Sequence, residues 1–251
     1  MNGKITKIYF SPTGNTKQSV DAMAAAIGNE FAEYDVTVRP DAAPCVLTAE
    51  DFAIFGMPVY GGRIPTVAKE RLARFWGTQT PCVVLVTYGN RHYDDALLEL
   101  ADLAREQGFV VKGAAALVGR HTYGDIQAGR PDADDLAAAA EFARKAAANS
   151  LTKPVSIGGN RPYKDGGSGG SFRPMTSGAC TACGICVQNC PTQAIGPDCK
   201  TISDKRCIAC FRCIRICPVG AKHMNTERYL AFAAEFSKKL QTRRESEYFY
   251  E

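Results

Sequence analysis

The chain has 251 residues and is 45% hydrophobic, enough to bury a core, which excludes a disordered protein. The net charge is +4, but residues 1–150 carry 15 basic and 18 acidic side chains, against 15 and 8 in residues 151–251. The basic excess is scattered, which argues against nucleic-acid binding, and no apolar run is long enough to span a membrane. The start alternates lysines with apolar residues instead of forming a secretion signal, so we expect a soluble, cytoplasmic protein.

The first 150 residues alternate the hydrophobic periods of strands and helices. Strands are predicted at residues 4–10, 34–39, 51–55, 82–88 and 109–119. Helices are predicted at residues 16–31, 65–76, 97–108 and 132–149. The residues expected to face inward are Val20, Met23, Ala24, Ile27 and Phe31 on the first helix and Ala68, Leu72, Phe75 and Trp76 on the second. This alternation predicts an α/β domain with a doubly wound, five-stranded parallel sheet.

Composition divides the rest of the chain. Residues 151–175 are rich in Gly, Pro and Ser, which predicts a flexible linker after a domain at residues 1–150. Such a linker need not by itself hold the next module against that domain. A cysteine-rich module is expected at 176–222 and a helix with a tail at 223–251, the helix covering residues 227–242. The aromatic end at Tyr248, Phe249 and Tyr250 suits a domain contact or a homodimer interface.

Nine of the 11 cysteines lie between residues 180 and 217. Eight of them form two C-x2-C-x2-C-x3-C-P runs, the second repeating the first 27 residues later. Zinc sites use two C-x2-C pairs, and disulfides do not suit a cytoplasmic chain, so neither alternative fits as well as iron–sulfur clusters. Cys45, Cys82 and Cys199 fall outside the two runs and are expected to be packing residues.

The two runs resemble those of bacterial ferredoxins with two [4Fe-4S] clusters, in which the fourth cysteine of each run binds the other cluster. The resemblance implies a small α+β ferredoxin-like domain that its clusters hold folded. It assigns one cluster to Cys180, Cys183, Cys186 and Cys217, and the other to Cys190, Cys207, Cys210 and Cys213.

A possible anion site lies directly after the first predicted strand. Residues 11–16 read SPTGNT and stand immediately before the first helix, where free N–H groups and hydroxyls can hold a phosphate without a cationic side chain. Such a loop can equally be a simple turn with an N-cap. The chain has no G-x-G-x-x-G, so a nicotinamide site has no support.

The loop resembles the FMN phosphate loop of flavodoxins, and residues 58–63 (PVYGGR) and 87–91 (TYGNR) match that family where its flavin contacts lie. The resemblance implies FMN at the carboxyl edge of the sheet. It assigns the phosphate to Ser11, Thr13, Gly14, Asn15 and Thr16, and the flavin ring to Pro58, Val59, Tyr60, Gly61, Gly62, Thr87, Tyr88, Gly89, Asn90 and Tyr93, with Tyr60 and Tyr88 near its faces.

Residues 1–222 together resemble ferredoxin-flavodoxin fusion proteins of anaerobic organisms. No acid, base or nucleophile constellation appears, so we expect an electron carrier that links its clusters and FMN to soluble redox partner proteins. The alternatives are an FMN-dependent reductase of a small organic acceptor and a redox sensor acting through a partner protein. Among the histidines, His92 and His223 are expected at the surface, whereas His121 begins a loop that could overhang the flavin.

Overall fold

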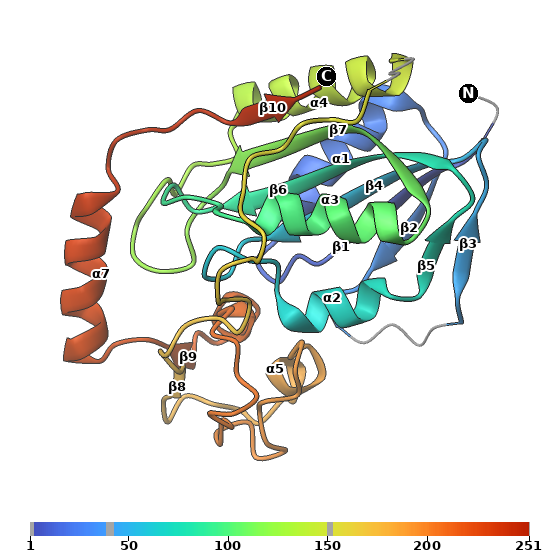
Figure 1. Cartoon of the computed structure of the whole chain (residues 1–251). Helices are drawn as coiled ribbons and strands as arrows, with labels where there is room; N and C mark the ends of the chain where they lie inside the picture. Colours follow the sequence, from blue (N-terminus) through green and yellow to red (C-terminus); the bar gives the residue numbers. More distant parts are fainter. Residues whose placement is uncertain (1–2, 39–42, 150–152, 251) are drawn as a thin grey trace.

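The computed structural model describes residues 3–38, 43–149 and 153–250. Within these residues, the main sheet has six strands in the order β10-β7-β6-β4-β1-β2 (Figure 1). Their bounds are β1 Ile5–Tyr9, β2 Phe31–Asp35, β4 Phe52–Pro58, β6 Thr80–Tyr88, β7 Phe109–Val118 and β10 Glu247–Phe249. Only β10 is antiparallel to its neighbour, and the order of the five parallel strands is that of a flavodoxin-like fold. The predicted fold class is thereby confirmed.

Helices cover both faces of the sheet (Figure 1). One core lies under α1 (Asn15–Ile27) and α4 (Ala133–Ala148), and the other under α2 (Thr66–Leu72) and α3 (Ala96–Glu106). Because both faces are covered, the central strands are apolar throughout, and every residue of β6 from Cys82 to Tyr88 is buried. No helix in the described part of the chain is long and apolar enough to cross a bilayer.

The first predicted helix is too long at its C-terminal end. The helix α1 ends at Ile27, and Phe31 starts β2, where it pairs with Ile5 and is 41% exposed. Gly28, in an extended conformation, breaks the helix and lets the chain turn back to the sheet. The strand predicted at 34–39 therefore lies too late in the chain: β2 begins three residues before the predicted start and ends at Asp35, and residue 39 lies outside the described residues.

The second predicted helix is also too long. The helix α2 ends at Leu72, and Phe75 and Trp76 belong to β5 (Phe75–Gly77), which pairs with β3 (Cys45–Leu47). Successive side chains of a strand point to opposite faces, so Phe75 is buried while Trp76 is 48% exposed. Cys45 lies in this small two-stranded sheet, where it pairs with Phe75.

The linker is attached to the sheet domain along most of its described length. Val155 is buried in the core beside α3. The carboxylate of Asp95 accepts backbone N–H groups from Asn160 and Lys164, each at 2.8 Å. The Gly167 N–H donates to the Tyr60 carbonyl at 2.9 Å. The expected free coil is therefore wrong for these residues, although residues 151 and 152 lie outside the described part.

The cysteine-rich module has little regular structure. It contains the short helices α5 (Ile185–Gln188) and α6 (Arg212–Arg215) and one antiparallel pair, β8 (Met175–Thr176) with β9 (Lys222–His223). Beyond it, α7 (Glu227–Lys239) stands beside the sheet domain, and the chain then returns to place β10 next to β7 (Figure 1). The helix predicted at 227–242 thus ends three residues early, and the aromatic end extends the sheet of its own chain.

Candidate functional site

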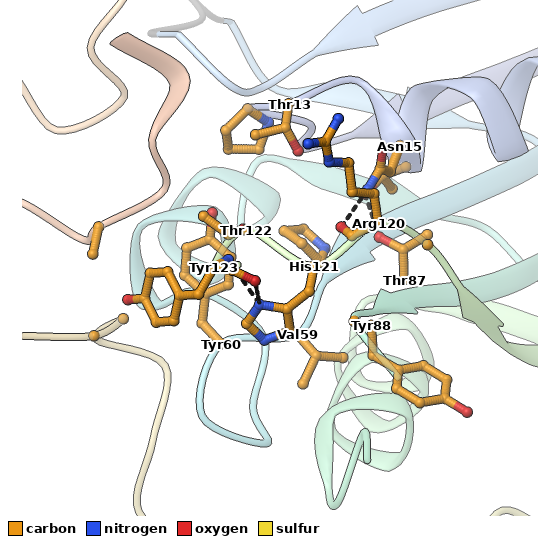
Figure 2. Close-up of a pocket in the computed structure, with 18 of the residues that line it drawn as sticks. Thr13, Asn15, Val59, Tyr60, Thr87, Tyr88, Arg120, His121, Thr122 and Tyr123 are labelled. Carbon is orange, nitrogen blue, oxygen red and sulfur yellow. Dashed lines mark hydrogen bonds between the residues drawn. The ribbon is translucent and has the colours of Figure 1, made fainter. Parts of the chain in front are cut away.

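A pocket lies at the carboxyl edge of the sheet, where the loops after β1, β4, β6 and β7 meet the linker and the cysteine-rich module (Figure 2). Of the predicted flavin-site residues, eleven are in its lining. The pocket is lined by Ser11, Pro12, Thr13, Asn15, Thr16, Pro58, Val59, Tyr60, Gly61, Thr87, Tyr88, Gly89, Gly119, Arg120, His121, Thr122, Tyr123, Gly169, Gly170, Ile208 and Ala209.

The loop after β1 presents unpaired backbone donors at the start of α1. Gly14 precedes the helix with φ of 96°, a conformation that favours glycine. Within the described residues, the N–H groups of Thr13, Gly14, Asn15 and Thr16 have no hydrogen-bond partner. The Ser11 hydroxyl instead accepts the Lys17 N–H at 3.0 Å and so shapes the loop. This arrangement fits a phosphate, which would accept from the free amides at a helix N-terminus.

Arg120 adds a cation that the sequence analysis did not anticipate. It lies just after β7, and its guanidinium reaches toward Thr13 (Figure 2). Its Nε is buried without a hydrogen-bond partner in the described part of the chain, which is costly unless a ligand supplies the acceptor. The Asn15 side chain donates to the Arg120 carbonyl at 2.8 Å and ties the two loops together.

The wall opposite the sheet contains His121 and Tyr123. The His121 ring lies against Gly89, where a Cβ would come within 2.2 Å of it, so only glycine permits this approach. The Tyr123 N–H donates to His121 Nδ1 at 2.8 Å, which leaves Nε2 to carry the proton of the neutral ring. Burial lowers the pKa of His121 to about 4, so the ring is neutral at pH 7.

Some predicted flavin contacts have other partners. The Tyr88 ring packs against Tyr93, with ring centroids 5.5 Å apart, and points away from the other labelled side chains (Figure 2). Asn90 and Tyr93 are buried and bond to the C-terminal tail instead. The Gly62 carbonyl accepts the Asp95 N–H at 3.0 Å. Neither these three residues nor Gly14 lines the pocket, and Tyr88 does not present its ring to it.

Four cysteines line a small, mostly apolar cavity. They are the predicted ligands of the second cluster, namely Cys190, Cys207, Cys210 and Cys213. Burial, with a smaller contribution from the neighbouring thiols, raises the pKa of Cys210 and of Cys213 to about 12. Clustered buried thiolates need a metal to hold their charge, so this donor set fits an iron–sulfur cluster.

The predicted ligands of the first cluster are more exposed. Cys186 is buried beside Cys199, which is only 2% exposed, whereas Cys183 is exposed. Burial works to raise the pKa of Cys217, but backbone N–H groups, including that of Ala221 at 3.2 Å from its sulfur, outweigh burial and lower this pKa. Among the described residues, no three Cys, His, Asp or Glu side chains converge on a single metal ion.

The cavity lined by Cys190, Cys207, Cys210 and Cys213 adjoins the pocket at the sheet edge. Ile208 and Ala209, which lie between Cys207 and Cys210 in the chain, line the wall of the pocket at the sheet edge. The pKa of Tyr60 on the same wall is raised, first by burial and then by the nearby Cys210 thiol. The two candidate sites are thus separated by one short loop.

Comparison with known proteins supports the second part of the chain as an iron–sulfur domain. Residues 122–235 match the family model of the 4Fe-4S dicluster domain. No curated protein matches the chain.

Several solved structures are similar to the N-terminal part. An archaeal flavodoxin is 15% identical over 57% of this chain and 96% of its own, with a TM-score of 0.42. A flavodoxin from Streptococcus pneumoniae is 22% identical over 57% of this chain and 98% of its own, with a TM-score of 0.39. The Flv1 flavodiiron core from Synechocystis is 20% identical over 58% of this chain, with a TM-score of 0.43, and this chain spans only 35% of its length.

The strand order and the domain match define the class of protein: a flavodoxin-like domain combined with an iron–sulfur domain. Residues 122–235 thus belong to the 4Fe-4S dicluster domain family, and they follow a domain whose strand order is flavodoxin-like.

Proposed function

We propose that the chain is an electron-transfer protein in which two [4Fe-4S] clusters exchange electrons with FMN. The observation that carries this proposal is the shared loop: Ile208 and Ala209 lie against the flavin pocket, while Cys207 and Cys210 on either side of them face the cavity of the second cluster. Clusters carry single electrons and FMN holds one or two, so the pair can convert between one- and two-electron chemistry.

The protein's own residues bind and separate these centres. The free N–H groups of Thr13, Asn15 and Thr16 receive the phosphate, and Tyr60 and Gly61 border the flavin ring. Cys190, Cys207, Cys210 and Cys213 hold the second cluster, and Cys180, Cys183, Cys186 and Cys217 hold the first. Because Cys183 is exposed, a cluster that it helps to hold would lie toward solvent, within reach of a soluble redox partner protein.

The test is anaerobic rapid mixing of the purified protein with a one-electron donor, after iron, sulfide and flavin have been quantified. We expect about eight iron atoms and one FMN per chain, with the clusters reduced before the flavin. Cys210→Ser is expected to remove the second cluster and slow flavin reduction at least tenfold, with unchanged FMN affinity. The control is Cys199→Ser, since Cys199 lies outside both ligand sets. Flavin reduction at an unaltered rate in Cys210→Ser overturns the relay.

A second candidate function is FMN-dependent reduction of a small organic acceptor. It is favoured by the neutral His121, whose Nε2–H is a hydrogen-bond donor on the pocket wall that could orient an acceptor oxygen. Screening quinones, nitroaromatics and enoates with reduced wild type and His121→Ala tests it. Selective, saturable turnover that falls in the variant supports this function, and its absence leaves a carrier.

A further inference from the structure

We propose that the phosphate of FMN is held by two arginines from different parts of the fusion, Arg120 of the flavodoxin-like domain and Arg215 of the cysteine-rich module. The inference rests on the proposed function, because it requires FMN in the pocket at the sheet edge. It makes the iron–sulfur module a direct contributor to flavin binding.

A further cavity borders both the loop at residues 11–16 and the loop after β7. It shares Thr13, Asn15, Arg120, His121 and Thr122 with the flavin pocket, and its other lining residues are Gln18, residues 128–131 and Arg215. No Asp or Glu is among the described residues that line it. A cavity with several cations and no carboxylate is suited to an anion.

The cations of this cavity differ in their partners. Arg130 forms a bidentate pair with Asp135, so its charge is already compensated. Within the described residues, the side chains of Arg120 and Arg215 have neither a hydrogen bond nor an ion pair. Arg120 and Arg215 line the same cavity, so their two positive charges repel each other across it. An anion between them would convert this repulsion into two attractions.

Docking of α6 explains how Arg215 reaches the cavity. Arg212, one turn earlier in α6, donates to the Pro12 carbonyl at 3.0 Å and to the Asn189 side chain at 3.3 Å. Residues three apart on a helix share a face, so the contact that fixes Arg212 on the phosphate loop also turns Arg215 toward it. The module is thus attached to the loop by one arginine and presents a second to the ligand.

The experiment compares FMN with riboflavin, which lacks the phosphate, on the full chain with its clusters loaded. Dissociation constants come from quenching of flavin fluorescence under anaerobic conditions. We expect Arg120→Ala to weaken FMN about tenfold or more, because it loses a partly buried charged hydrogen bond. Arg215→Ala is expected to weaken FMN about two- to fivefold, since Arg215 is exposed, and Arg215→Lys to restore part of the loss.

Riboflavin affinity is the internal control for folding and should not change in any of these variants. The matched charge control is Lys205→Ala, which removes an exposed cation of the module that lines neither the flavin pocket nor the cavity with Arg215. Inorganic phosphate should compete with FMN and not with riboflavin.

Equal loss of FMN and riboflavin affinity, or no loss of either, overturns the inference while the proposed function stands. Simultaneous binding of phosphate and FMN also overturns it, because the arginine site would then be separate. If the unaltered protein binds neither flavin, the proposed function itself fails.

Discussion

Replacing Asn90 should release the C-terminal tail without affecting the flavin. The Asn90 side chain is 1% exposed and donates to the carbonyls of Leu240 and Thr242 at 2.8 Å each, while its oxygen accepts the Arg244 N–H at 3.1 Å. Each hydrogen bond contributes about 1 kcal/mol net, so the loss of all three lowers the local stability of the tail by about 3 kcal/mol. Asn90 has φ of 63°, a left-handed conformation that glycine adopts easily, so Asn90→Gly deletes these bonds without backbone strain. Asn90→Ala would also delete the bonds, but alanine in this conformation costs about 1 kcal/mol of backbone strain in addition.

Hydrogen exchange by mass spectrometry on the full chain measures this effect. In Asn90→Gly, the amides of residues 240–250 should exchange at least thirtyfold faster, which corresponds to about 2 kcal/mol or more. FMN affinity should stay within about twofold, because Asn90 does not line the pocket. The control is Asn160→Gly, which loses a bond to Asp95 at 3.2 Å in the linker and should leave the tail protected. Unchanged exchange together with weakened FMN binding would refute the assignment of Asn90 to the tail.

Three further predictions concern the pocket and the clusters. Gly89→Val should weaken FMN binding at least tenfold in a fluorescence titration, because the new side chain collides with the His121 ring. Cys190→Ser should halve the iron content measured against protein, whereas Cys199→Ser should leave it unchanged. Because burial holds the pKa of His121 near 4, the unfolded chain takes up a proton below pH 6.5 that the folded chain refuses. Stability in urea should therefore fall as the pH drops from about 6.5 toward 4, and His121→Gln should flatten that slope.

The sheet was predictable because its signals are local. Each central strand is an apolar run, and each is followed by a helix with its own period. The short strands gave no such signal, since their pairing depends on distant partners. The strand β10 lies beside Ala114–Ala116, whose small side chains leave room for Tyr248 to pack against Phe142 at 5.2 Å between ring centroids. Nothing in residues 247–249 alone indicates that neighbour.

The pocket, too, has a part that a local sequence motif indicates and a part that depends on distant segments. The loop at residues 11–16 is contiguous and could be identified from the sequence, whereas Arg120, Gly169 and Ile208 come from three distant segments. Tyr88 was expected near a face of the flavin ring, but side chains alternate along a strand, and this alternation turns Tyr88 away from the pocket. The Thr87 hydroxyl lies 2.6 Å from that of Thr16, so the next residue on β6 has to point to the opposite face, toward Tyr93.

The C-terminal half of the chain completes a pocket that the first half only begins. Gly169 of the linker and Ile208 of the module line it directly. The helix α7 supports its opposite wall, since the Tyr229 hydroxyl accepts the Gly124 N–H at 3.2 Å and Phe236 packs edge-on to His121 at 5.1 Å between ring centroids. A flavodoxin-like domain alone would leave this wall open to water. The C-terminal half therefore covers part of the pocket and brings the cavity lined by Cys190, Cys207, Cys210 and Cys213 next to it.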